Sequence, residues 1–184
     1  MKNQELLSKE GTALVIIDIQ EKLFPHMTEK DRIAQNIAKL LKFAEIMKIP
    51  IVLTEQYPKG LGRTIPEVKR LIPSIHPIEK VDFNCLGSEE FKACLGRLEA
   101  KTLVIAGIES HICVTQTAVD GLNKGYNIYV VSDAVSSRSQ ADKAIAIERM
   151  RQSGVTIVST EMLIYELLGR AGTAEFKEAL KLVR

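Results

Sequence analysis

The sequence has no tryptophan, only three cysteines among 184 residues, and a formal net charge of just +2. It also lacks any apolar run near the roughly 18 residues that a membrane-spanning helix needs. The small charge and the scattered basic residues give no reason to expect nucleic acid or a membrane as a partner. An odd number of cysteines fits reduced thiols better than a disulfide framework, and Met1–Glu10 lacks the apolar core of a signal peptide. We therefore expect a cytoplasmic protein.

Familiar metal and phosphate motifs are missing as well. No His-x-His, Cys-x-x-Cys or His-Glu-x-x-His pattern occurs, so we predict neither a metal nor another cofactor. The segment Gly60–Thr64 resembles a phosphate loop only in its two glycines, and Pro66 follows at once. A flexible turn is the better interpretation of this segment.

What the sequence does contain is a regular alternation of strand-like and helix-like segments. Short apolar runs typical of buried parallel strands occur at 12–18, 50–54, 76–81, 101–106, 126–132 and 155–159. Helix-like spacing of apolar residues occurs at 28–48, 67–71, 88–98, 112–124, 139–152, 161–168 and 173–182. This alternation predicts a single α/β domain over residues 1–184, with three α/β/α layers around a mainly parallel six-stranded sheet. The Gly- and Pro-rich segment 55–66 is predicted to be irregular, a candidate lid or pocket loop.

Ligands of parallel sheets bind at the carboxyl ends of the strands, and Asp18 ends the first strand after five apolar residues. A carboxylate buried there is costly unless a cation or hydrogen-bond donors offset its desolvation. The alternative for Asp18 is a helix cap or turn former. Lys80, at the end of the third predicted strand, is a source of that cation, although on its own it would be interpreted as a solvated lysine.

A third candidate, Cys113, follows the buried strand Leu103–Ala106 and the break at Gly107. We expect it in the first turn of the next helix, where unpaired N–H groups and the helix dipole favour the thiolate. Such a position suits a nucleophile. The alternative is a small buried apolar residue, the interpretation we give to Cys85 and Cys94.

Histidine is the usual base for a cysteine nucleophile, but none of the three histidines has a spacing that requires this role. His111 is two residues before Cys113, and helical residues at that spacing do not face each other. His26 and His76 fall in segments flanked by proline. A cysteine–histidine hydrolase that uses His26 or His76 stays open as a minor alternative.

Taken together, Asp18, Lys80 and Cys113 make the chain resemble the isochorismatase-like cysteine hydrolase superfamily, which includes nicotinamidases and N-carbamoylsarcosine amidohydrolase. The motifs that carry the resemblance are Ala13–Gln20, Lys80 followed by Phe83, and Ala106–Ala118. Two further segments, Thr54–Thr64 and Asp133–Ser139, are similar to the isochorismatase domain-containing branch, whose substrates are poorly defined.

The resemblance implies a catalytic triad of Asp18, Lys80 and Cys113. It also implies a non-proline cis peptide bond between Ile108 and Glu109, and an oxyanion hole formed by the backbone N–H groups of Glu109 and Cys113. A homo-oligomer that acts on a small molecule is implied too. Residues that would line the substrate pocket are Gln20, Phe24 and Phe83.

Two departures from relatives in that superfamily narrow the expected chemistry. Nicotinamidases carry an Asp/His metal site after the second strand, whereas this chain has Glu55-Gln-Tyr-Pro there and no histidine. Members that cleave isochorismate act on a vinyl ether and need no thiol. The expected function is therefore a cysteine-dependent amidohydrolase of a small amide, imide or ureido compound, working through a thioester. The alternatives are a vinyl-ether hydrolase and a non-catalytic or redox-sensing protein that retains the fold.

Overall fold

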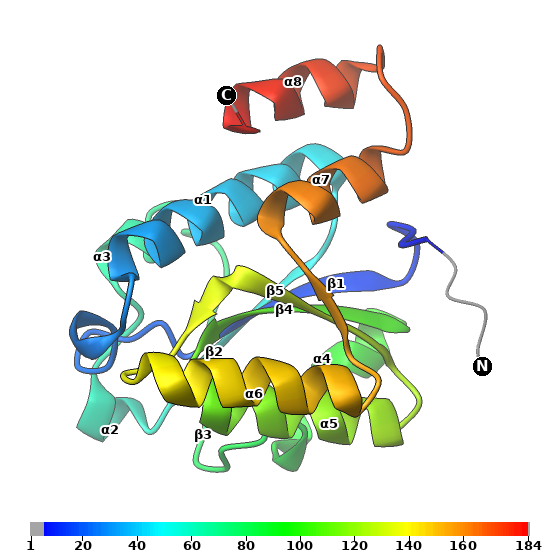
Figure 1. Ribbon diagram of the computed structural model, residues 1–184. Helices are drawn as coiled ribbons and strands as arrows, with labels where there is room; N and C mark the ends of the chain where they lie inside the picture. Colours follow the sequence, from blue (N-terminus) through cyan, green and yellow to red (C-terminus); the bar gives the residue numbers. More distant parts are fainter. Residues whose placement is uncertain (1–5, 184) are drawn as a thin grey trace.

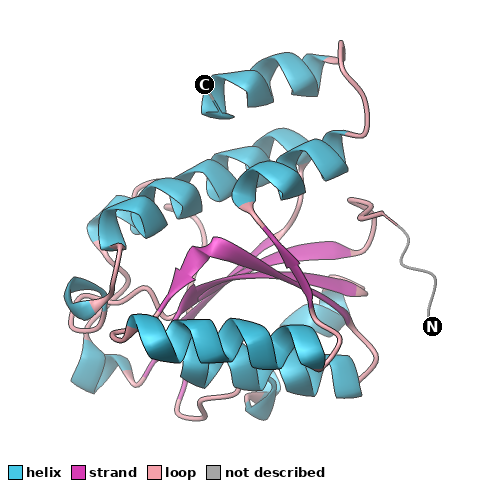
Figure 2. Cartoon of the chain, in the orientation of Figure 1, coloured by secondary structure: helices cyan, strands magenta, loops and turns pink. Residues whose placement is uncertain are grey.

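A computed structural model describes residues 6–183 and has a six-stranded, wholly parallel sheet at its centre (Figures 1 and 2). In spatial order the strands are β3 (Ile78–Lys80), β2 (Ile51–Gln56), β1 (Thr12–Ile17), β4 (Thr102–Ile108), β5 (Asn127–Ser136) and β6 (Thr156–Val158). The predicted fold class and the number of strands are confirmed, and the predicted mainly parallel sheet is parallel throughout.

Helices cover both faces of the sheet and complete three layers (Figure 1). One face carries α1 (Lys30–Met47) and α7 (Thr160–Leu168), with α8 (Ala174–Val183) packed outside them. The other face carries α4 (Glu89–Arg97), α5 (Thr115–Asn123) and α6 (Gln140–Gln152). Shorter elements are α2 (Pro58–Leu61), α3 (Pro66–Lys69), the 3₁₀ turns Phe24–His26 and Cys85–Gly87, and a π-helical turn, Ser110–Val114. Within residues 6–183, no helix combines the length and hydrophobicity needed to cross a membrane.

The central strands are apolar because both of their faces are covered. Every residue of β1 and β4 is buried. Successive side chains of β1 point to opposite sides of the sheet, so Leu14 and Ile16 join the core under α1 while Val15 and Ile17 join the core on the other face. This explains why these strands are near-continuous apolar runs rather than alternating ones.

The order of the strands places a crevice between β1 and β4. From β1 the chain adds β2 and β3 on one side and then crosses back to add β4, β5 and β6 on the other. Parallel sheets bind ligands outside the carboxyl ends of the strands at such a switch point. The residues that follow β1 and β4 therefore flank the expected binding position.

Segment 55–66 differs from the irregular loop that the sequence predicts. Strand β2 continues to Gln56, and Pro58–Leu61 forms a helical turn. The buried Glu55 carboxylate accepts hydrogen bonds from the backbone N–H and the hydroxyl of Thr64, both at 2.7 Å. Because these bonds fasten the end of the segment to the sheet, the structure gives no support for a freely moving lid.

Candidate active site

Asp18 and Lys80 form a buried ion pair at the carboxyl edge of the sheet. Asp18 follows β1 in a left-handed conformation (φ 52°), and Lys80 is the last residue of β3. The Lys80 Nζ lies 2.7 Å from Asp18 Oδ2, and both side chains are 0% exposed. The close ammonium offsets the cost of burying the carboxylate, as the sequence reasoning required.

Two residues of β2 connect the partners of this pair, because β2 lies between β1 and β3. The Thr54 hydroxyl donates to Asp18 Oδ1 at 2.7 Å, and Gln56 Oε1 accepts from Lys80 Nζ at 2.7 Å. The two residues share one face of the strand, being two positions apart. Sequence reasoning missed both, although polar residues at alternate positions near the end of an apolar strand are a signal that could have been followed.

The ammonium of Lys80 is held as a fixed cation. Besides Asp18 and Gln56 it donates to the Asp82 carbonyl at 3.3 Å, so each of its three donors has an acceptor. Burial by itself would lower the pKa of Lys80, but the negative charge of Asp18, with which it also forms a hydrogen bond, opposes this effect, and the pKa lies above its ordinary value. Lys80 therefore stays protonated at neutral pH.

Cys113 lies in the π-helical turn that precedes α5 and is only 6% exposed. Burial, then the negative charge of Asp18, raise the pKa of the thiol well above its usual range, while Lys80 opposes the shift. The Asp18 carboxylate therefore lies close enough to the Cys113 thiol to act on its protonation. Loss of water and an adjacent carboxylate thus oppose the helix terminus, which was expected to favour the thiolate.

The turn that carries Cys113 is tied to neighbouring elements. The peptide bond between Ile108 and Glu109 is cis, the conformation that the resemblance implies. The Glu109 carbonyl accepts hydrogen bonds from the N–H groups of Ile112 and Val114, at 3.1 and 3.2 Å. The buried Glu109 carboxylate accepts from the backbone N–H and Nε of Arg138, both at 3.1 Å, which fastens the turn to the residues after β5.

The three residues predicted to line a pocket have different surroundings. The side chain of buried Gln20 donates to the carbonyls of Gln56 (3.0 Å) and Gly62 (2.8 Å) and accepts from the N–H of Gln56 (2.7 Å), so it fastens residues 56–62 beside the site. Phe24 is partly buried against the core under α1. Phe83 is 55% exposed, and its carbonyl lies 3.5 Å from Lys80 Nζ. Contact between these residues and a substrate stays a prediction.

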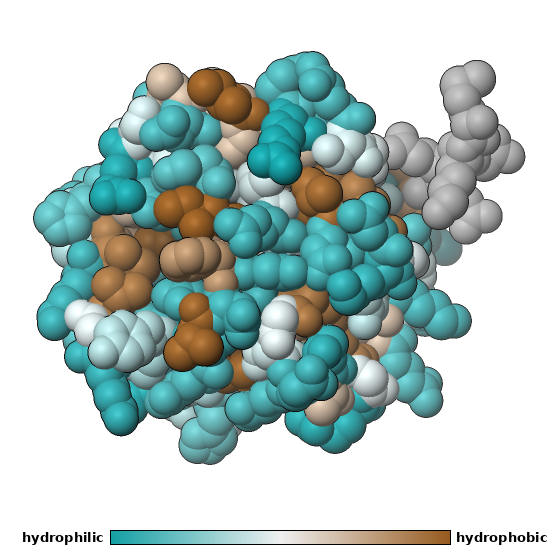
Figure 3. Space-filling model, turned by 90° about the horizontal axis from the view of Figure 1, so that it is seen from below, coloured by the Kyte–Doolittle hydropathy of each residue, from teal (hydrophilic) through white to brown (hydrophobic). Residues whose placement is uncertain are grey.

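The surface near Lys80 is more apolar than the site beneath it. Tyr57, Val81 and Phe83 are large and exposed, and the Tyr57 N–H donates to the Lys80 carbonyl at 2.9 Å. Figure 3 views the face covered by α4, α5 and α6, where apolar residues gather toward the side on which the strands of Figure 1 end. Exposed apolar side chains thus lie next to the buried polar site.

The histidines have other surroundings. His26 and His76 are exposed, and His111 Nδ1 lies 2.9 Å from the Ser137 hydroxyl. The basic group that contacts the Cys113 thiol is the Asp18 carboxylate. The geometry therefore favours an aspartate over a histidine as the base.

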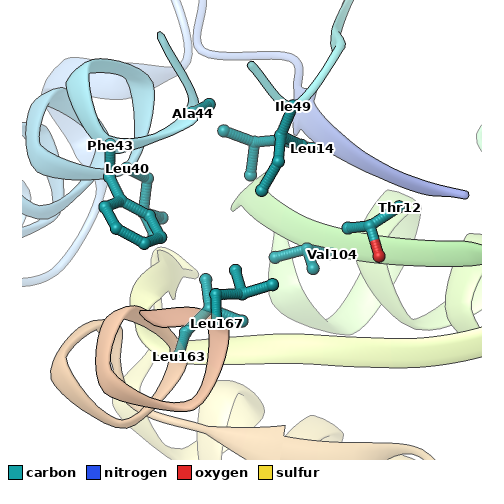
Figure 4. Close-up of a pocket in the computed structure, with 9 residues that line it drawn as sticks. All are labelled: Thr12, Leu14, Leu40, Phe43, Ala44, Ile49, Val104, Leu163 and Leu167. Atoms are coloured by element: carbon teal, nitrogen blue, oxygen red, sulfur yellow. The ribbon is translucent and has the colours of Figure 1, made fainter. Parts of the chain in front are cut away.

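A pocket elsewhere in the protein is unconnected with these residues. It lies between the sheet and helices α1 and α7, toward the amino ends of β1 and β4 (Figure 4). Its lining is Thr12, Leu14, Leu40, Phe43, Ala44, Ile49, Val104, Leu163 and Leu167. It contains none of the charged groups of the candidate site.

Comparison with known proteins matches this sequence and fold to one family. The family model described as the isochorismatase domain matches residues 12–162. Isochorismatase domain-containing protein 2A of Mus musculus is 39% identical over 175 residues, covering 95% of this chain and 84% of that protein.

Solved structures share the fold of this chain. A structure described as MAR1 ribonuclease from Caenorhabditis elegans is 36% identical, with a TM-score of 0.90 over 97% of this chain and 92% of that one. The YcaC gene product of Escherichia coli, described as an octameric hydrolase of unknown specificity, is 24% identical and shares the fold with a TM-score of 0.91, over 99% of this chain and 92% of that one. From the family model and the mouse relative together, we conclude that this chain belongs to the isochorismatase family of hydrolases, in the branch of the isochorismatase domain-containing proteins.

Proposed function

We propose that the protein is a cysteine-dependent hydrolase of a small amide, imide or ureido compound and that it works through a thioester on Cys113. One observation carries the proposal: the Cys113 thiol lies beside the carboxylate of Asp18, which is itself paired with the buried ammonium of Lys80. A nucleophile, a base and a fixed cation therefore meet in a site from which water is largely excluded.

Acylation begins from the protonated thiol. As the Cys113 sulfur attacks the substrate carbonyl carbon, its proton passes to the Asp18 carboxylate and the carbonyl electron pair moves onto oxygen. Because burial and Asp18 raise the pKa of this thiol, proton transfer accompanies the attack, and no resting thiolate is needed. The backbone N–H groups of Glu109 and Cys113 bind the oxyanion, one such donor contributing about 2.7–4 kcal/mol.

Collapse of the tetrahedral intermediate completes the first half of the reaction. The C–N bond breaks, Asp18 returns the proton to the leaving nitrogen, and a thioester remains on Cys113. Asp18 then takes a proton from water as that water attacks the thioester, and the departing sulfur regains the proton. An amide gives an amine or ammonia and a carboxylic acid, an imide gives an amide and a carboxylic acid, and a ureido compound gives an amine or ammonia and a carbamic acid; in each case the thiol is restored.

In this scheme Lys80 moves no proton. Its raised pKa and its three acceptors support the role of a permanent cation. It stabilises the negative charge on Asp18 at rest and the charge that develops on sulfur during attack. The same charge fixes the carboxylate in place, with one oxygen on Lys80 and the other on Thr54.

A panel of small amides, imides and ureido compounds tests the proposal. We expect Cys113→Ala and Asp18→Asn each to abolish turnover while near-ultraviolet circular dichroism shows the native fold. Cys94→Ala is the matched control, because Cys94 lies on α4 away from the ion pair. Full activity in Cys113→Ala would refute covalent catalysis.

Cleavage of a vinyl ether is the second candidate, favoured by the family that the chain matches. That reaction needs a proton donor near the ether and no thiol. An assay with isochorismate separates the two: cleavage that survives Cys113→Ala and stops in Asp18→Asn supports the vinyl-ether reaction. RNA is included in the same panel because the C. elegans structure is described as a ribonuclease, although the net charge of +2 here favours small substrates.

The redox-sensing alternative has less support. Sensor cysteines are accessible and have a low pKa, whereas Cys113 is buried and its pKa is raised. The three cysteines are free, which agrees with a reducing, cytoplasmic location. The exposed apolar residues Tyr57, Val81 and Phe83 support a homo-oligomer, which analytical ultracentrifugation would detect.

A further inference from the structure

Thr54 contacts Asp18 through both its side chain and its backbone. Its hydroxyl donates to Asp18 Oδ1 at 2.7 Å, and its carbonyl accepts the Asp18 N–H at 3.2 Å. Thr54 is itself 0% exposed on the central strand β2. No step of the proposed reaction needs Thr54 to touch the substrate, so any effect of its hydroxyl on the reaction passes through Asp18.

The surroundings of Thr54 fix the direction in which its hydroxyl donates. Cys85 is fully buried, with its thiol against the hydroxyls of Thr54 and Thr117, and its backbone N–H donates to Thr117 at 3.0 Å. Burial raises the pKa of Cys85 to about 11, so at neutral pH this residue is an uncharged thiol with a proton to donate. The Thr54 oxygen can accept that proton while its own hydrogen points at the carboxylate.

Lys80 and Thr54 together use one oxygen each of the Asp18 carboxylate. Their two bonds fix the orientation of the carboxylate beside the Cys113 thiol. A hydrogen bond given to a carboxylate stabilises the ionised form over the protonated one. Lys80 stabilises the Asp18 carboxylate by its charge. Thr54 orients the carboxylate and stabilises its ionised form further.

We infer that Thr54 is a positioning residue for the general base and sets the lowest pH at which Asp18 can activate Cys113. The inference rests on the proposed role of Asp18 as the base for this cysteine. Removing the hydroxyl makes Asp18 easier to protonate, so the acidic limb of Cys113 reactivity moves to higher pH. A hydrogen bond to a charged group corresponds to a shift of about one to two pH units.

Alkylation by iodoacetamide measures the pH dependence of Cys113 reactivity without a known substrate. The full-length protein is treated with iodoacetamide at a series of acidic to neutral pH values. Peptide mass spectrometry then gives the rate of carbamidomethylation at Cys113 as a function of pH. Thr54→Val removes the hydroxyl and keeps the shape, whereas Thr54→Ser keeps the hydroxyl. Thr12→Val is the matched control: Thr12 is buried at the amino end of β1, where its hydroxyl donates to the Ser8 carbonyl at 2.6 Å.

We expect the acidic limb to move up by about one to two pH units in Thr54→Val and to stay in place in Thr54→Ser and Thr12→Val. If the valine variant fails to fold, Thr54→Ala and Thr54→Ser make the same comparison of hydroxyl absent and present. A Thr54→Val profile that superimposes on the wild type overturns the inference, and so does an equal shift in Thr12→Val.

The test of Thr54 can fail independently of the test of covalent catalysis. Turnover that survives in Cys113→Ala overturns covalent catalysis whatever the alkylation profiles show. Turnover that depends on Cys113, together with an unshifted Thr54→Val profile, overturns the positioning role alone.

Discussion

Replacing Lys80 by methionine tests whether the ion pair is as buried as the structure describes. Lys80→Met keeps an apolar stem of similar length and leaves the carboxylate of Asp18 with the Thr54 hydroxyl and no cation. Since both side chains are 0% exposed and the charged atoms lie 2.7 Å apart, water cannot replace the lost partner. Removing one member of a buried pair costs about 3–5 kcal/mol of unfolding free energy. That is a large part of the usual stability of a domain of this size.

Urea denaturation followed by circular dichroism measures this loss through the midpoint and the slope. The double variant Asp18→Asn, Lys80→Met should be more stable than Lys80→Met alone, because no unpaired charge stays buried. The control is Arg151→Met, which removes an ion pair of 2.8 Å to Glu148 in which both side chains are 55% exposed, and it should cost at most about 0.5 kcal/mol. A loss in Lys80→Met as small as in the control would show that water reaches Asp18, and the reasoning would fail.

Three further predictions concern the same region. First, burial raises the pKa of Cys85 to about 11, so the stability that this thiol contributes is complete below its ordinary pKa and is lost as pH rises toward 11. Urea titrations across this range should show a fall in unfolding free energy of up to about 3 kcal/mol, and Cys85→Ala should reduce the fall. Second, Gln56→Met removes both the acceptor of a Lys80 hydrogen bond and the donor to the Val81 carbonyl, each at 2.7 Å, and should lower the unfolding free energy measured by urea denaturation by about 1–3 kcal/mol. Third, Gly107 has φ +120° and an added Cβ would meet the Ile17 carbonyl oxygen at 2.1 Å, so Gly107→Ala should accumulate as insoluble protein; soluble, native-like protein would contradict the close approach of β4 to β1.

The fold was predictable because its signal is local. Buried parallel strands require short apolar runs, and each run that the sequence contains forms a strand of the sheet. The boundaries were less predictable: β5 continues to Ser136, beyond the predicted end at 132, and Cys113 falls in a π-helical turn rather than in the first turn of α5. These endings depend on contacts between elements, such as the bonds from Arg138 to Glu109.

The site was predictable in part. Asp18, Lys80 and Cys113 could be nominated because each ends or follows a strand, and the structure brings the three together. The protonation of Cys113 was not predictable, since the helix terminus is visible in the sequence whereas the extent of burial and the contact with Asp18 are not. The supporting residue Gln56 was missed because its role depends on the register of β2 with β3, which places it opposite Lys80.

The most direct test of covalent catalysis by the buried triad is intact-protein mass spectrometry of the wild type quenched during turnover of an amide from the panel. The account predicts an added mass equal to the acyl group, located on Cys113 by peptide mapping, released by hydroxylamine and missing in Cys113→Ala. Substrate consumed at the wild-type rate by Cys113→Ala, with no acyl adduct on the wild-type protein at any quench time, would contradict it.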